Sequence, residues 1–201
     1  MKIFCVGLNY KEHIVEMKHF AFPESPVIFM KPPTALLKNG QPFYYPEFSS
    51  DVHYEGEIVL RVCKNGKKID QKFAHKYYDA FTLGFDFTAR DIQAEQKKKG
   101  WPWEIAKGFD GSAFSGDFIP LEKEKVISFT IKKNNEVVQQ GDTSMLIFSF
   151  DEIISYISKF FTLQQGDLIY TGTPQGVGPV QIGDVLEGWV EDQLIVKCEI
   201  K

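Results

Sequence analysis

The stretch YEGEIVLRVC, residues 54–63, alternates side chains in the manner of a β-strand. Asn65-Gly66 follows it and predicts a tight hairpin turn. A second hairpin is predicted at Asn134-Asn135, between strands at 126–132 and 136–139. Further short strands are predicted at 2–6, 168–171, 185–190 and 194–200. The chain is therefore rich in β-structure.

Helical spacing predicts only four short helices. These are 9 to about 18, 70 to about 80, 89–99 and a segment that begins after Ser149. Thr88 is the predicted N-cap of the third helix and Gly100 follows its end, while Ser149 and Glu152 form a capping box for the fourth. Short helices scattered among many strands do not form a regular βαβ alternation, so a doubly wound parallel sheet is not expected. We expect an α+β, mainly β fold, in a single domain of residues 1–201.

The composition is that of a globular protein with a slightly acidic charge. Hydrophobic residues make up 43% of the 201 residues and the net charge is −4 at pH 7. Lys97-Lys98-Lys99 is the one basic run, so we expect no nucleic-acid partner. No apolar run approaches the roughly 18 residues of a membrane helix, so we expect no membrane partner. The three cysteines are far apart and form no metal-binding cluster, which favours a reducing compartment and a cytoplasmic protein.

Glu55 and Glu57 are candidate metal ligands. Side chains two positions apart on a strand point to the same face, about 6.5–7 Å apart, so the two carboxylates would face one another. Like charges at that spacing repel unless a cation lies between them, and oxygen-only ligands favour Mg²⁺, Mn²⁺ or Ca²⁺. The alternative is a solvent-facing strand with two surface glutamates, but the apolar run 58–60 follows at once and favours burial.

Asp86, in GFDFTARD (84–91), ends an apolar stretch just before a predicted helix. It is a candidate for a third carboxylate ligand, with a turn or capping role as the alternative. Arg90 and Gln93 share one face of that helix, because residues three apart lie next to one another on a helix surface. They are candidates for binding a substrate carboxylate, and surface exposure is their alternative role.

His13 and Glu16 are also three residues apart on a predicted helix, in GLNYKEHIVEM (7–17). A carboxylate bound to one imidazole nitrogen fixes the tautomer and makes the other nitrogen a better base. The pair is thus a candidate general base, and the alternative is an ordinary exposed His–Glu pair.

Lys107 and the loop TGTPQGVG (171–178) complete the candidate chemistry. A lysine ammonium stabilises negative charge that develops on an enolate oxygen. A glycine-rich loop lets backbone N–H groups and a threonine hydroxyl approach an anion, although no phosphate-binding GxxxxGK[ST] motif is present. The alternatives are an exposed lysine and a plain turn.

Taken in order, these stretches resemble the fumarylacetoacetate hydrolase family, and in particular its compact acylpyruvase and oxaloacetate decarboxylase members. The resemblance rests on the E-x-E, D-x-TARD and TGTPxGVGP strings and covers nearly the whole chain. It implies a mixed β-roll with a few short helices, which is usually a homodimer. It also implies roles for individual residues. The implied metal ligands are Glu55, Glu57 and Asp86, the implied lid dyad is His13 and Glu16, and the implied charge-stabilising and substrate-binding residues are Lys107, Arg90, Gln93 and Thr173.

The function expected from this resemblance is a hydrolase or lyase that uses Mg²⁺ or Mn²⁺, with Ca²⁺ as a further candidate. It would cleave acylpyruvates, or decarboxylate oxaloacetate, through an enolate of pyruvate stabilised by the cation and Lys107. The first alternative is an isomerase or tautomerase of unsaturated 2-oxo diacids, which would use the same enolate. The second is a metal-binding protein without catalytic activity. The identity of the substrate's distal group does not follow from the sequence.

Overall fold

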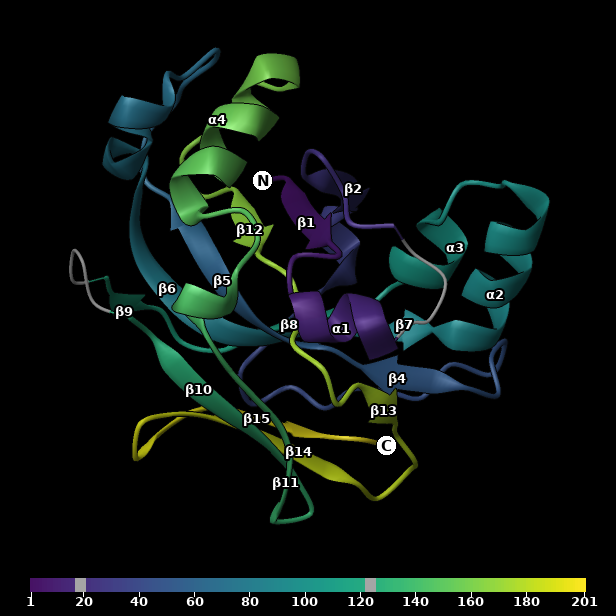
Figure 1. The fold of residues 1–201 in the computed structure, drawn as a ribbon. Helices are drawn as coiled ribbons and strands as arrows, with labels where there is room; N and C mark the ends of the chain where they lie inside the picture. Colours follow the sequence, from purple (N-terminus) through teal and green to yellow (C-terminus); the bar gives the residue numbers. More distant parts are fainter. Residues whose placement is uncertain (17–20, 122–125) are drawn as a thin grey trace.

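The largest sheet has eight strands and contributes the largest share of the hydrophobic core (Figure 1). The computed structural model describes residues 1–16, 21–121 and 126–201, and the strands are those of this part of the chain. The strand order is β2-β1-β12-β5-β6-β8-β3, and β9 also pairs with β6. The strands are β1 (Ile3–Gly7), β2 (Val27–Lys31), β3 (Leu36–Lys38), β5 (Gly56–Val62), β6 (Tyr78–Asp86), β8 (Ala113–Ser115), β9 (Ile119–Pro120) and β12 (Leu168–Tyr170).

Antiparallel pairing dominates this sheet, and it is not the doubly wound parallel sheet that the sequence analysis also did not expect. Only the pairs β1–β12 and β3–β8 are parallel. The longest ladder joins β5 and β6, from Gly56 opposite Phe85 to Val62 opposite Tyr78. Both strands are almost entirely buried because other layers cover both of their faces.

A four-stranded sheet, in the order β11-β10-β14-β15, packs against the larger one. Its strands are β10 (Ser128–Lys133), β11 (Glu136–Asp142), β14 (Val185–Val190) and β15 (Gln193–Glu199). The two layers approach so closely that a Cβ atom on Gly56 would overlap the Ile131 side chain. Glycine is therefore required between the two glutamates. A third, short sheet contains β4 (Val52–Tyr54), β7 (Thr88–Ala89) and β13 (Gly178–Pro179).

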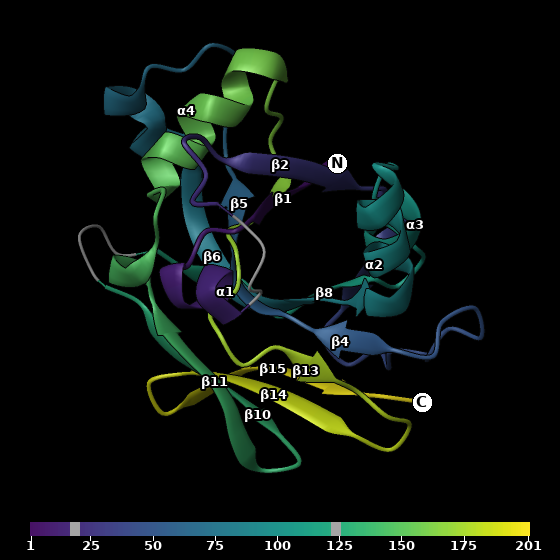
Figure 2. The ribbon, with the colours of Figure 1, turned by 45° about the vertical axis from the view of Figure 1, so that its right-hand side comes forward.

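The helices lie around the sheets. The α-helices are α1 (Lys11–Glu16), α2 (Arg90–Lys99), α3 (Glu104–Lys107) and α4 (Phe150–Phe160), and the 3-10 helices are η1 (Pro33–Ala35), η2 (Gln71–Lys76) and η3 (Thr143–Met145). Figures 1 and 2 place α4 and the α2–α3 pair on opposite sides of the molecule, with α1 between them. None of the helices in the described ranges is long and apolar enough to cross a membrane.

Several local predictions are confirmed. Asn134 and Asn135 both have positive φ values and connect β10 to β11 as a hairpin. The capping box of Ser149 and Glu152 is present at the start of α4. Gly100 caps α2 in the left-handed conformation, with φ 67°. The first helix begins at Lys11, and its predicted end near residue 18 lies outside the described residues.

Three local predictions are wrong. Asp70 caps only a 3-10 helix, and the chain from Tyr78 onward forms β6 rather than the end of a helix, because it pairs with β5. Asn65-Gly66 does not form a tight hairpin, since residues 63–77 separate β5 from β6. Thr88 does not cap α2; its hydroxyl donates to Glu55 Oε1 at 3.1 Å instead.

Candidate active site

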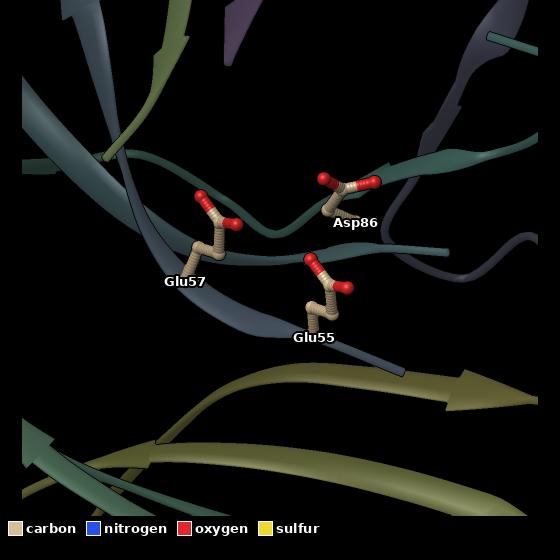
Figure 3. Close-up of side chains that lie close together, drawn as sticks. All are labelled: Glu55, Glu57 and Asp86. Carbon is tan, nitrogen blue, oxygen red and sulfur yellow. The ribbon is translucent and has the colours of Figure 1, made fainter. Parts of the chain in front are cut away.

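Three buried carboxylates meet at one end of the β5–β6 ladder (Figure 3). Glu55 lies just before β5, Glu57 lies within it, and Asp86 ends β6. The backbone N–H of Asp86 donates to the carbonyl of Glu55 at 2.9 Å, so the antiparallel register places these two residues side by side. One oxygen of each carboxylate lies within 4.8 Å of the others, and the side chains point toward one another.

The burial of these carboxylates argues against the alternative interpretation, a solvent-facing strand with two surface glutamates. Glu55, Glu57 and Asp86 are 6%, 2% and 1% exposed. Burial and the charges of Asp86 and Glu55 hold the pKa of Glu57 well above its usual value. Burial also acts to raise the pKa of Glu55, but the charges of Lys107 and Arg90 outweigh it and lower that pKa. Three carboxylate oxygens this close together fit the ligand set of a hard divalent cation. Such a cation would relieve the charge repulsion that acts on Glu57.

Lys107 and Arg90 hold the carboxylates in place. The Lys107 ammonium donates to Glu55 Oε2 and Asp86 Oδ2, both at 2.8 Å. The Arg90 guanidinium donates to Glu55 Oε1 at 2.6 Å and to Gln93 Oε1 at 2.8 Å. Lys107 is 3% exposed, which rules out the alternative of a solvated lysine. Lys107 is the last residue of the four-residue helix α3.

Lys31, at the end of β2, is a second buried lysine that the sequence analysis did not single out. Its ammonium lies 2.8 Å from Asp86 Oδ1 and donates to the carbonyl of Ser112 at 3.0 Å. It also donates to the carbonyl of Lys107. Lys31 thereby ties a candidate metal ligand to the segment that carries Lys107. The one signal in the sequence is a lone lysine that ends an apolar strand, and this pattern alone predicts no partner.

The candidate base pair lies on α1. His13 Nδ1 is 3.1 Å from Glu16 Oε2, and His13 lines the same cavity as the three carboxylates. Glu16 also accepts the backbone N–H of Gly176 at 3.1 Å, which joins α1 to the glycine-rich loop. Because Glu16 occupies Nδ1, Nε2 is left as the proton-accepting nitrogen of neutral His13. With Nδ1 bound to Glu16 and His13 at the cavity, the pair could serve as a general base.

A helix face of α2 forms one wall of the same cavity. Arg90, Gln93 and Lys97 all line it, at positions i, i+3 and i+7. Gln93 is only 3% exposed, so the surface alternative does not hold for it. Lys97 was not among the predicted site residues, although its spacing from Arg90 places it on the same helix face. The cavity thus carries a third cationic side chain.

Thr173 also lines the cavity, but its hydroxyl is bound within the protein. It donates to the carbonyl of Gly56 at 2.9 Å and accepts from Gln139 Nε2 at 2.8 Å. Gln139 comes from β11, so the second sheet fixes the loop that follows β12. The neighbouring Gly172 N–H donates to Glu57 Oε2 at 2.7 Å. The loop that contains Thr173 therefore positions Glu57 through its backbone.

Asn9 was also missed by the sequence analysis. Its side chain donates to the carbonyl of Thr171 at 2.8 Å and accepts the backbone N–H of Phe148 at 2.7 Å. These bonds join the residues before α1 to the glycine-rich loop. An asparagine at the start of a predicted helix is typical of a cap, so the sequence could not predict its long-range partners.

Comparison with known proteins identifies relatives over nearly the full length. The family model for the fumarylacetoacetate (FAA) hydrolase C-terminal region matches residues 2–201. The chain is 41% identical to the mitochondrial oxaloacetate tautomerase FAHD1 of Mus musculus, over 99% of this chain and 91% of the relative. It is also 41% identical to the oxaloacetate tautomerase YcgM of Escherichia coli, over 92% of this chain and 86% of that protein.

Solved structures agree with this assignment. The fumarylpyruvate hydrolase of Pseudomonas aeruginosa, in complex with Mn²⁺ and pyruvate, superposes with a TM-score of 0.91 at 34% identity, over 100% of this chain and 90% of that one. The 2-hydroxyhepta-2,4-diene-1,7-dioate isomerase of Mycobacterium marinum gives 0.86 at 33% identity, over 99% and 73%. The mixed, mainly β fold and the full-length sequence match lead to one conclusion. This chain belongs to the fumarylacetoacetate hydrolase family.

Proposed function

We propose that this protein is an enzyme that binds one divalent cation and interconverts the keto and enol forms of a small 2-oxo acid, or cleaves it, through a common enolate. The observation that carries the proposal is the buried cluster of Glu55, Glu57 and Asp86 within reach of Lys107 and His13. Relatives named oxaloacetate tautomerase favour a substrate of the oxaloacetate type. A purely structural metal site would not need a base and a lysine in the same cavity.

The cation, when bound, supplies Lewis-acid stabilisation of negative charge at the 2-oxo oxygen. The three carboxylates would hold it. Lys107 then adds a second positive charge beside that oxygen, at a site from which water is largely excluded. Gln93, held by Arg90, has its amide N–H groups available to orient the substrate carboxylate.

His13 is the proposed base. In tautomerisation, its Nε2 accepts the proton from carbon 3, the C–H electron pair forms the C2–C3 double bond, the C2–O π pair moves to the 2-oxo oxygen, and the imidazolium returns the proton to that oxygen. Glu16 stabilises the imidazolium that forms. Reversal of these steps at the same base returns the keto form.

Hydrolysis of an acylpyruvate is the second candidate, and the His13–Glu16 pair favours it. Here His13 takes a proton from water, and the water oxygen attacks the distal carbonyl carbon. The C3–C4 bond breaks, its electron pair becomes the enolate of pyruvate, and carbon 3 is then protonated. The fumarylpyruvate hydrolase among the similar structures supports this chemistry.

A spectrophotometric assay separates these candidates. Oxaloacetate enol–keto exchange and acetylpyruvate loss are followed with Mg²⁺, with Mn²⁺ and with EDTA, in wild type and His13→Ala. We expect both activities to require the cation and both to be lost in His13→Ala, because His13 is the proposed base in each, so the substrate that wild type turns over decides between the candidates. Decarboxylation of oxaloacetate needs no water nucleophile and should be largely retained. Activity that is indifferent to EDTA would contradict the metal-dependent proposal.

Three narrower expectations remain predictions. Mg²⁺ is the proposed physiological ion, and Mn²⁺ is the ion in a similar structure. A homodimer is tested by sedimentation velocity of the purified chain. The three cysteines form no disulfide with one another. This supports the cytoplasmic location, which imaging of the tagged protein would test.

A further inference from the structure

Gly56 lies between two candidate metal ligands, so its peptide groups set how far apart the Glu55 and Glu57 side chains stand. The carbonyl of Glu55 accepts from the N–H of Asp86 on β6. Ladder hydrogen bonds alternate in direction along an antiparallel strand, so the N–H and C=O of the next residue, Gly56, point away from β6. Gly56 is buried, and each of these two groups therefore needs a hydrogen-bond partner inside the protein.

The neighbouring strand on that side ends before it reaches Gly56. β12 pairs with β5 as far as Tyr170, and the N–H of Thr171 then donates to the carbonyl of Ile58 at 3.0 Å. The backbone leaves the extended conformation at Gly172, which has a φ of 103°. Two side chains take the place of the strand as partners of Gly56.

These side chains are Gln139 and Thr173. Gln139 Oε1 accepts from the N–H of Gly56 at 2.9 Å, and the Thr173 hydroxyl donates to the carbonyl of Gly56 at 2.9 Å. The Gln139 amide nitrogen donates to Thr173 Oγ1 at 2.8 Å, so the three residues form a closed ring of hydrogen bonds. One ring thereby holds the peptide group before Gly56 and the peptide group after it.

A glutamine side chain is the one that these partners require. Gln139 is 2% exposed, and its amide nitrogen also donates to the carbonyl of Pro174 at 2.9 Å. The N–H of Gly56 can only donate and the carbonyl of Pro174 can only accept, so one orientation of the amide satisfies both. A carboxylate at this position would have no donor, and a hydrocarbon would have neither a donor nor an acceptor.

The loop that Gln139 holds also contacts Glu57 and the candidate base pair. The N–H of Gly172 donates to Glu57 Oε2 at 2.7 Å. Further along the loop, the N–H of Gly176 donates to Glu16 Oε1 at 3.1 Å. Gln139 belongs to β11 in the four-stranded sheet. Its side chain therefore attaches the second sheet both to the strand that carries the ligands and to the loop beside it.

We propose that Gln139 is a positioning residue for the cation site, which sets the spacing of Glu55 and Glu57 and fixes the glycine-rich loop against them. The inference rests on the proposed function, because it assumes that these carboxylates hold a divalent cation. Gln139 acts through Gly56 and Thr173 and lies outside the set of described residues that line the cavity. Its effect should therefore appear in cation binding itself, before any substrate is present.

Calorimetric titration with Mn²⁺, after removal of bound metal with EDTA, tests this role. Gln139→Met keeps the length of the side chain and removes all three of its hydrogen bonds. We expect the dissociation constant for Mn²⁺ to rise by roughly 10- to 100-fold, since groups that orient metal ligands have effects of this size. Gln140→Met, at the exposed next position of the same strand, should stay within about twofold of wild type.

A second control separates positioning from a general loss of stability. The buried Ser158 hydroxyl accepts the backbone N–H of Ile69 at 2.8 Å, much as Gln139 accepts that of Gly56, but it lies on α4. Ser158→Ala and Gln139→Met should both lower the melting temperature, by about 3–8 °C. Ser158→Ala should leave the Mn²⁺ dissociation constant unchanged. Equal weakening of Mn²⁺ binding in both variants would contradict a specific role for Gln139.

Thr173 offers a pair of variants that act on the other peptide group of Gly56. Thr173→Val removes the hydroxyl and keeps the shape, so Mn²⁺ should bind roughly tenfold more weakly. Thr173→Ser keeps the hydroxyl and should bind Mn²⁺ as wild type does. The losses in Gln139→Met and Thr173→Val should not add in the double variant, because each change opens the same ring. Additive losses would show that the two residues act independently and would overturn the proposed ring.

Amide hydrogen exchange of the metal-free protein gives a readout that needs neither the cation nor turnover. The N–H groups of Gly56 and Gly172 should exchange at least about tenfold faster in Gln139→Met than in wild type, and at the wild-type rate in Gln140→Met. A wild type that binds no Mn²⁺ contradicts the proposed function and the inference that rests on it. If wild type binds Mn²⁺ and Gln139→Met shows the same affinity and the same exchange rates, only the role of Gln139 is overturned.

Discussion

Glu16 accepts a hydrogen bond from the backbone N–H of Gly176, across 160 residues of chain. The same carboxylate holds His13 Nδ1 through its second oxygen. Orientation of the base and attachment of α1 to the glycine-rich loop therefore depend on one side chain. Any change that frees α1 should also disorient the base.

Replacement of Glu16 separates these two effects. Glu16→Gln keeps an oxygen that accepts from Gly176 but cannot stabilise the imidazolium, so we expect kcat to fall by roughly 10- to 100-fold with little change in KM. Glu16→Ala removes both contacts and should raise KM as well. Steady-state kinetics on acetylpyruvate measures the difference, and identical profiles for the two variants would contradict the attachment role.

Gly176→Ala tests the loop itself. Gly176 has a φ of 96°, and an added Cβ would overlap the carbonyl of Val138. The loop must therefore shift, and we expect a loss of roughly 2–4 kcal/mol in the free energy of unfolding together with reduced turnover. Gly183→Ala is the matched control, because Gly183 has a φ of 97° with open space around it. It should cost roughly 1–2 kcal/mol and leave turnover unchanged. Equal losses in both variants would show that packing against Val138 is unimportant.

Lys31→Met removes a fully buried ammonium. It leaves Asp86 without one of its cations and removes one of the two donors to each of the carbonyls of Ser112 and Lys107. We expect the free energy of unfolding to fall by roughly 3–5 kcal/mol and the melting temperature by roughly 10 °C. Thermal unfolding measures this, with Lys72→Met in an exposed ion pair as the control. A melting temperature equal to that of the control would contradict the structural role of Lys31.

Cation binding should depend on pH through Glu57. Its pKa is raised by burial and by the charges of Asp86 and Glu55, so a proton on Glu57 competes with the cation up to a higher pH than on an ordinary glutamate. Below that raised pKa the cation must displace the proton, and the apparent affinity should fall by up to about tenfold per unit of decreasing pH. Calorimetric titration with Mn²⁺ in two buffers of different ionisation enthalpy measures the number of protons that the protein releases when the ion binds. Glu57→Gln should bind more weakly and release none, and an affinity independent of pH would contradict this account.

The sequence alone determined the class of fold and the candidate residues. Alternating strands and sparse helices indicate a mainly β chain because side-chain periodicity reports which faces are buried. The capping box of Ser149 and Glu152 and the Asn134-Asn135 turn were predictable because their interactions are local. Glu55, Glu57 and Asp86 were recognised by residue type and by family resemblance.

Only the tertiary structure decided how these residues meet. The β5–β6 register places Asp86 beside Glu55, and this pairing turns the predicted end of a helix at 78–80 into a strand. The Thr88 hydroxyl donates a hydrogen bond to Glu55 rather than capping a helix. The Lys31 ammonium, on another strand, forms an ion pair with Asp86. Lys97 lines the cavity because α2 packs with the face that carries Lys97 toward the cavity. These contacts join residues far apart in sequence, and local periodicity carries no information about such partners.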